Sequence, residues 1–131
     1  MWHILKHIKS VSTKYIFMNN NELITPKMVK SYLNEQYKAN ITSKMFRTWY
    51  ANYHLLDFLR RNKNNIISEK YNINDGINYV SSKLNNTPGI SRKAYVNNKI
   101  FNHILDNPNH FIKYIPNDIH SYLIKLMRKH L

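Results

Sequence analysis

The stretch "ITSKMFRTWYANYHLL", residues 41–56, has the apolar spacing of an amphipathic helix. At 100° per residue, one side of this helix collects its large apolar residues, Met45, Phe46, Trp49, Tyr53 and Leu56. Lys44 and Arg47 point the other way, one turn apart, where two cations could clamp a phosphate or could form an ordinary solvated face. The pattern predicts a helix that begins near residue 42 or 43 and ends near Arg61.

Helical spacing continues on both sides of this segment. Thr25 followed by Pro26 is typical of a helix start and predicts a helix over 26–38. Further helices are predicted from residue 74 or 75, through Tyr95 after the Pro88-Gly89 turn, over 97–105, and after Pro116. The sequence therefore predicts a mainly α, compact, multi-helix fold, with 1–131 as a single domain.

The segments between these helices are expected to be connectors. They are the polar stretch at 60–72 and the segment between Pro108 and Pro116. Only "TKYIF" at 13–17 alternates like a strand, so we expect at most one short strand.

Charge is the clearest signal in the composition. Twenty Lys and Arg residues against seven Asp and Glu residues give a net charge of +13, which favours nucleic acid as the partner. The chain has no cysteine, no apolar run of about 20 residues and no secretory signal at its start. We expect an intracellular protein associated with double-stranded DNA in a virion, a viral factory or a nucleoid, neither secreted nor membrane-bound.

A second basic segment, "NNTPGISRKAY", covers residues 85–95. Pro88-Gly89 forces a turn, and the short helix that follows brings Arg92 and Lys93 close to Tyr95. A phenol with a pKa of about 10 is protonated at neutral pH, so a nucleophilic tyrosine needs cations or hydrogen-bond donors around it. Taken alone, Tyr95 is more readily explained as a packing aromatic.

Together, "SKMFRTWYANY" and the later "LNNTPGISRKAY" resemble the C-terminal catalytic region of type IB DNA topoisomerases, especially the short poxvirus-like and bacterial forms. The resemblance implies that Tyr95 attacks a backbone phosphate and forms a 3′-phosphotyrosyl link. The freed 5′-hydroxyl strand would swivel before religation, which relaxes supercoils without ATP, metal or another cofactor.

The resemblance also implies roles for the surrounding residues. Arg47 would stabilise charge on the non-bridging phosphate oxygens. Asn86 would donate a hydrogen bond to one of them, at a place where many relatives have His. Lys44, Arg92 and Lys93 would contact the DNA backbone near the site.

The family's site also contains an Arg and a Lys upstream of the Lys-x-x-Arg helix, and the Lys, on a β-hairpin loop, acts as general acid. The 43 residues before Lys44 show no convincing hairpin, and no spacing supports Lys6, Lys9 or Lys14. We therefore expect the C-terminal part of a larger catalytic domain, without its DNA-clamping domain and very weak or inactive alone. It could be a truncated product, a remnant, or one half of a split enzyme whose second polypeptide supplies the Arg and Lys.

Two other functions remain open. The first is a non-catalytic basic DNA-binding module, for which Tyr95 would be dispensable. The second is a tyrosine recombinase or integrase fragment, although that family usually has His-x-x-Arg where this chain has Lys44. No metal site is expected, because His3 and His7 are spaced as ligands on a helix but lack a third ligand.

Overall fold

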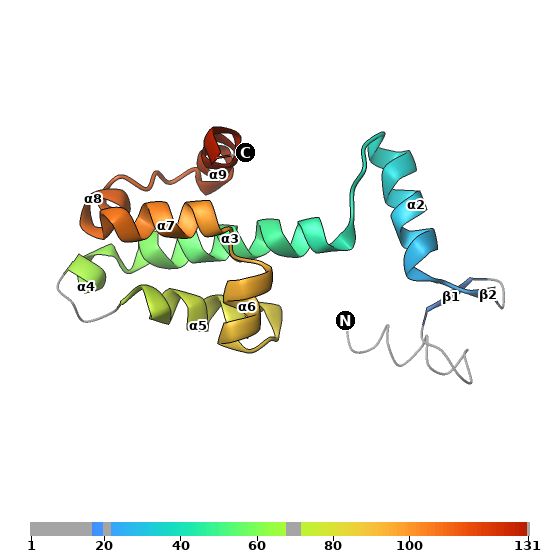
Figure 1. Ribbon diagram of the computed structural model, residues 1–131, viewed down its shortest axis with the longest axis horizontal. Coiled ribbons are helices and arrows are strands. Elements are labelled where there is room, and N and C mark those ends of the chain that lie inside the picture. The colour runs from blue at the N-terminus through green and yellow to red at the C-terminus, as the bar shows by residue number, and fades with distance from the viewer. Residues whose placement is uncertain (1–16, 20–21, 68–71, 131) are drawn as a thin grey trace. The chain divides into compact units, whose positions relative to one another are not determined.

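The computed structural model describes residues 17–19, 22–67 and 72–130 of the 131-residue chain. The chain divides into two compact units, Met1–Ser43 and Lys44–Leu131, which we call unit 1 and unit 2 (Figure 1). That 1–131 is a single domain stays a prediction.

Unit 1 contains a small hairpin. Strand β1 (Met18–Asn19) pairs antiparallel with strand β2 (Glu22–Leu23), and Ile24 N donates to Phe17 O at 3.0 Å beside this pair. Our expectations of no convincing hairpin and of at most one short strand were therefore wrong. The expected strand at 13–17 falls outside the described residues except for Phe17, which lies in a bend.

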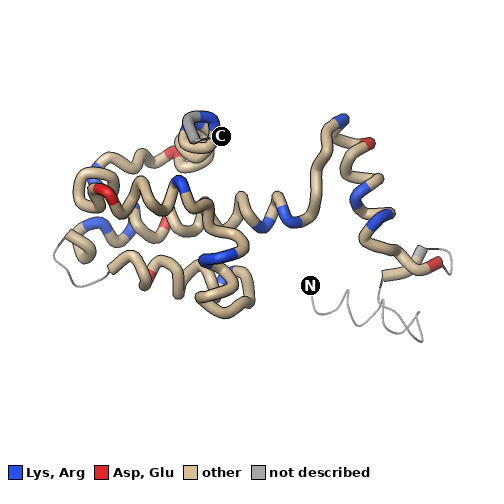
Figure 2. Tube along the Cα trace, in the orientation of Figure 1, with Lys and Arg blue, Asp and Glu red and all other residues tan. Residues whose placement is uncertain are grey.

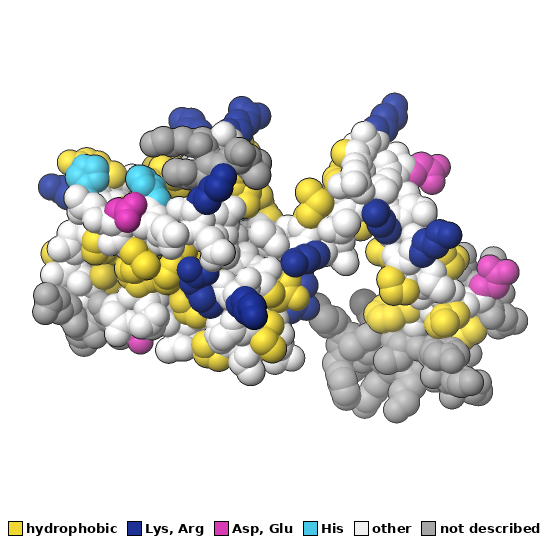
Figure 3. Space-filling view, viewed as in Figure 1, with side chains coloured by type: hydrophobic (Ala, Val, Ile, Leu, Met, Phe, Trp, Pro, Cys, Tyr) yellow, Lys and Arg dark blue, Asp and Glu magenta, His cyan; other side chains and the backbone are white. Residues whose placement is uncertain are grey.

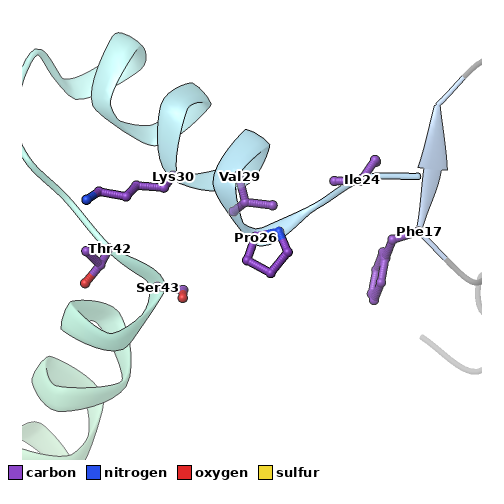
Figure 4. Close-up of a pocket in the computed structure, with 7 residues that line it drawn as sticks. All are labelled: Phe17, Ile24, Pro26, Val29, Lys30, Thr42 and Ser43. Carbon is purple, nitrogen blue, oxygen red and sulfur yellow. The ribbon is translucent and has the colours of Figure 1, made fainter. Parts of the chain in front are cut away.

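Helix α2 (Pro26–Tyr37) follows the hairpin. Thr25 Oγ1 accepts from Met28 N at 3.3 Å and caps the helix, and Lys38 ends it with a left-handed backbone (φ 50°). None of the described residues of unit 1 is buried. Its apolar side chains instead line an open pocket (Figure 4), formed by Phe17, Ile24, Pro26, Val29, Lys30, Thr42 and Ser43.

Helices make up unit 2, which confirms the prediction of a mainly α fold. They are α3 (Ser43–Arg61), α4 (Lys63–Ile67), α5 (Ile73–Leu84), α6 (Pro88–Ala94), α7 (Asn98–Asp106), α8 (Pro108–Lys113) and α9 (Ile119–His130). Helices α4 and α8 lie in segments that we expected to be connectors, because each is too short to show a helical period. No helix in the described part of the chain is long and apolar enough to cross a membrane.

The core of unit 2 is built around α3, which runs through the middle of the unit (Figure 1). Leu55, Leu56 and Leu59 are fully buried against apolar residues of α5, α7, α8 and α9. Met45 and Phe46, which belong to the apolar side expected for this helix, are 53% and 48% exposed. The apolar contacts of α3 begin only at Trp49, so the first turn is left outside the core.

Helix α5 packs closely against α3. An added Cβ at Gly76 would lie 2.9 Å from Leu55 Cδ1, so glycine lets the two helices approach at this point. The close packing places the C-terminal end of α5 beside α3, where the candidate site lies.

Candidate functional site

Arg47 and Tyr95 lie together although 48 positions separate them in the sequence. The Arg47 guanidinium lies over the Tyr95 ring, with Cζ 5.0 Å from the ring centroid. Arg47 Nη2 also donates to Leu84 O, at the last residue of α5, at 2.9 Å. One side chain of α3 therefore contacts both the end of α5 and the residue that follows α6.

The turn between α5 and α6 is fixed by caps on both sides. Asn85 adopts the left-handed conformation (φ 53°) that ends α5, and Asn86 N donates to Ser81 O at 3.0 Å. Thr87 Oγ1 accepts from Ile90 N at 3.3 Å and caps α6, with Pro88 in its first turn. These bonds hold Asn86 between the two helices.

Asn86 has an unused hydrogen-bond donor. Its Nδ2 atom is buried and bonds to no described residue. An unpaired buried amide group is unfavourable. A hydrogen bond from Asn86 Nδ2 to an acceptor such as a phosphate oxygen would therefore be favourable. The structure places Asn86 two residues beyond Leu84, whose carbonyl holds Arg47.

Tyr95 is the C-terminal cap residue of α6. Its backbone N–H donates to Ser91 O at 3.2 Å, and its half-buried ring packs against the core. Its hydroxyl makes no hydrogen bond with another residue in the described part of the chain. The hydroxyl is therefore not committed to the fold.

Asn52 was missed by the sequence analysis. This fully buried residue of α3 donates from Nδ2 to Tyr95 O and accepts at Oδ1 from Asn97 N, both at 3.0 Å. The signal was present, because Asn52 shares a helix face with Leu55, Leu56 and Leu59, and a polar residue on such a face needs a partner.

The Lys and Arg positions of the chain are marked in blue along the Cα trace in Figure 2. The cations predicted to bind phosphate differ in their side-chain contacts. The side chains of Lys44 and Lys93 are exposed and bond to no other described residue. Arg92 lies with Cζ 3.8 Å from the centroid of the Phe101 ring, and its Nη1 donates to Asn98 Oδ1 at 2.6 Å. Burial lowers the pKa of Arg92. Arg92 thus links α6 to α7, and its contact with phosphate stays a prediction.

We call the six residues that the sequence singled out the tyrosine site; they are Lys44, Arg47, Asn86, Arg92, Lys93 and Tyr95. No ion pair among the described residues involves its cations. Asp57 is buried against Arg60 and Arg61, while Asp75 and Asp118 bond to backbone N–H groups at the starts of α5 and α9. On the face of unit 2 drawn in Figure 3, cationic side chains outnumber acidic ones. The tyrosine site therefore has uncompensated positive charge for an anion.

No general acid accompanies the tyrosine site among the described contacts. No lysine in the described part of the chain is bonded to Arg47 or Tyr95. The sequence between Phe17 and Ile24, which forms the hairpin, contains no lysine, and Lys6, Lys9 and Lys14 lie outside the described residues. The described residues also hold no group of three His, Asp or Glu side chains that could bind a metal ion, while His3 and His7 are not described.

His54 lies two turns along α3 from Arg47 and is enclosed by aromatic rings. The ring centroids of Tyr50, Tyr53 and Tyr79 lie 4.1, 5.4 and 5.9 Å from that of His54. Both ring nitrogens are buried without a hydrogen-bond partner among the described residues. Burial is the main cause that lowers the pKa of His54 from 6.5; Lys83 and Arg61 lower it further, and Asp57 opposes them.

We expect this histidine to make the stability of unit 2 depend on pH. The pKa of His54 is lower in the folded state than in the unfolded state. Its contribution to the free energy of unfolding is therefore fully present above about pH 6.5 and is lost as the pH falls through the folded-state pKa. The melting temperature of the natural chain should therefore fall more steeply between about pH 7.5 and about pH 5 than that of His54→Phe. Equal slopes for the natural chain and His54→Phe would contradict the prediction.

Comparison with known proteins identifies a family for the chain. Residues 1–122 match the family described as eukaryotic DNA topoisomerase I, catalytic core. Neither a curated protein nor a solved structure matches the chain. The match contains the whole tyrosine site and supports the resemblance to type IB topoisomerases, while the narrower likeness to poxvirus-like and bacterial forms stays a prediction. Because the match spans more than nine-tenths of its length, the chain belongs to the family of the eukaryotic DNA topoisomerase I catalytic core.

Proposed function

We propose that the chain acts on double-stranded DNA as a catalytic region of a type IB topoisomerase, with Tyr95 as nucleophile. The observation that carries this is the Arg47 guanidinium, held by Leu84 O and lying over the Tyr95 ring. The Tyr95 oxygen forms a bond to a backbone phosphorus and loses its proton to solvent water, and the bond between phosphorus and the 5′-oxygen breaks. Reversal of the same exchange religates the strand, so no external energy source is needed.

Arg47 is suited to the charge that develops at the phosphate. A guanidinium has five N–H donors, and the hydrogen bond to Leu84 O uses one of them. The others can bind non-bridging oxygens, where donors placed in advance stabilise the transition state. Asn86 offers a further donor through its unpaired Nδ2 group, and Lys44 and Lys93 can hold neighbouring phosphates.

The departing 5′-oxygen needs a proton, and we propose that the group supplying it comes from outside residues 1–131. A general acid contributes about 10² to 10⁴ in rate, and one charge-stabilising donor about 10² to 10³. A lysine and an arginine, from elsewhere in the protein or from a second polypeptide, would complete the site. We therefore expect residues 1–131 alone to cleave ordinary DNA extremely slowly.

A substrate with a better leaving group tests the nucleophile and the missing general acid separately. In a 5′-bridging phosphorothiolate the departing atom is sulfur, which leaves as a thiolate without a proton. We expect a covalent protein–DNA adduct on a set of duplexes carrying this linkage at successive positions, at least about 100-fold faster than on ordinary DNA. Gel electrophoresis and mass spectrometry would detect the adduct. Absence of any adduct on either DNA, despite binding, would overturn the proposed chemistry.

That negative outcome would favour a basic DNA-binding module, which the uncompensated cations of the tyrosine site also allow. Affinity would then fall with salt, by about 0.9 log unit per phosphate contact for each tenfold rise. A tyrosine recombinase fragment is a weaker alternative. It would exchange strands between paired specific sites, whereas a topoisomerase relaxes supercoils without partner DNA.

A further inference from the structure

The side chain of Asn52 is committed to the backbone around Tyr95. Nδ2 donates to Thr48 O at 2.7 Å and to Tyr95 O at 3.0 Å, while Oδ1 accepts from Asn97 N at 3.0 Å. Both amide hydrogens of the side chain are therefore used, along with one lone pair of its oxygen. Only the Thr48 bond lies within α3.

The remaining backbone bonds show how completely this segment is held. Tyr95 N and Val96 N both donate to Ser91 O, at 3.2 and 3.0 Å. With the two bonds from Asn52, the backbone is tied at Tyr95 N, Tyr95 O, Val96 N and Asn97 N. Only the torsions of the Tyr95 side chain remain to place its hydroxyl, and the ring already rests against the core.

A purely structural role, as a buried asparagine with all its hydrogen bonds made, would also explain these three bonds. Two features favour a role in positioning Tyr95. Asn52 stands on the face of Leu55, Leu56 and Leu59, where an apolar side chain could be buried without needing a partner. Its two long-range bonds both go to the three-residue segment that begins with the proposed nucleophile. Arg47 lies five residues earlier on the same helix, so one rigid element sets the position of both groups.

We propose that Asn52 is a positioning residue: it holds the Tyr95 backbone so that the hydroxyl and the Arg47 guanidinium meet the same phosphate. The proposal rests on the function proposed above. Misplacement of a reacting group by about 1 Å costs about 100-fold in rate. Loss of Asn52 should therefore slow adduct formation without weakening DNA binding.

The test uses two variants of the full chain and one matched control. Asn52→Leu removes all three bonds, whereas Asn52→Asp keeps the acceptor for Asn97 N but loses the donors to Tyr95 O. The control is Asn62→Leu, because Asn62 Nδ2 makes the same bond to a carbonyl four residues back, Phe58 O at 2.9 Å, but Asn62 lies one residue beyond the C-terminal end of α3.

We expect both Asn52 variants to form the adduct about 100-fold more slowly on saturating phosphorothiolate DNA, with unchanged affinity, and the control to keep the natural rate. Natural rates in both Asn52 variants would overturn the proposal. So would a parallel loss in Asn62→Leu, or unfolding of both Asn52 variants, since each would show a structural role alone.

A second measurement does not depend on cleavage. Amide hydrogen exchange at Asn97 should be faster in Asn52→Leu by at least about tenfold and unchanged in Asn62→Leu, because Asn52 Oδ1 is the acceptor of that amide among the described residues. If the natural chain forms no adduct but this exchange changes as expected, the proposed function fails while the holding of the Tyr95 segment stands. Unchanged exchange would overturn the positioning role itself.

Discussion

Tyr95→Phe is expected to abolish the covalent DNA adduct completely, on phosphorothiolate and ordinary DNA alike. The substitution removes only the hydroxyl, which bonds to no other residue in the described part of the chain. The ring that lies under Arg47 and packs against the core is kept, so folding and DNA affinity should not change. Gel electrophoresis and mass spectrometry detect the adduct, thermal denaturation measures folding, and a binding isotherm measures DNA affinity on the same preparation.

Tyr53→Phe is the matched control. Tyr53 is also half-buried, packs against the same core and stacks on His120, with ring centroids 4.5 Å apart. It should form the adduct at the natural rate. A residual adduct in Tyr95→Phe would show that another residue is the nucleophile, and mapping the modified peptide would identify it.

The second large effect is expected at Arg47. Arg47→Ala should slow adduct formation on phosphorothiolate DNA by about 10² to 10³, the typical cost of removing one transition-state donor. Arg47→Lys should recover only part of this rate, because an ammonium retains the charge but lacks the paired donors of a guanidinium. Single-turnover rates at saturating DNA separate this loss from any change in affinity.

Arg47→Ala should also lower stability, by about 0.5 to 1.5 kcal/mol, because Leu84 O loses its partner. Arg60→Ala tests whether instability alone slows the reaction. Arg60 is a cation of the same helix, bonded to Asp57 and Asn117 away from the tyrosine site. If it slowed the adduct as much as Arg47→Ala does, a specific role for Arg47 would be excluded.

The sequence was sufficient to predict the long helices, because each carries enough turns for its period to show. The bounds of α2 and α3 agree with the predicted ranges to within about one residue. Helices α4 and α8, of five and six residues, were missed, since short helices depend on tertiary contacts. The hairpin was missed for the same reason, with two residues in each strand.

Within the site, the order and spacing of the two basic segments predicted Arg47 and Tyr95 as site residues. The structure brings these two residues together. Sequence spacing could not show that Arg92 stacks on Phe101, because the contact joins two helices across a turn. The bonds of Asn52 were equally hidden, because their partners lie 43 and 45 residues away. Such contacts depend on how the helices pack, which local periodicity does not encode.

The hydrogen bond from Arg47 to Leu84 O affects which residues of the site would change first if selection for catalysis ceased. The arginine caps a carbonyl at the end of α5, so purifying selection on folding alone would retain it. The Tyr95 hydroxyl makes no hydrogen bond to another described residue. Its replacement by phenylalanine would therefore be neutral for folding. In an inactive descendant, Arg47 would therefore be retained for longer than Tyr95. The presence of Tyr95 is the better indicator that a related chain is catalytically active.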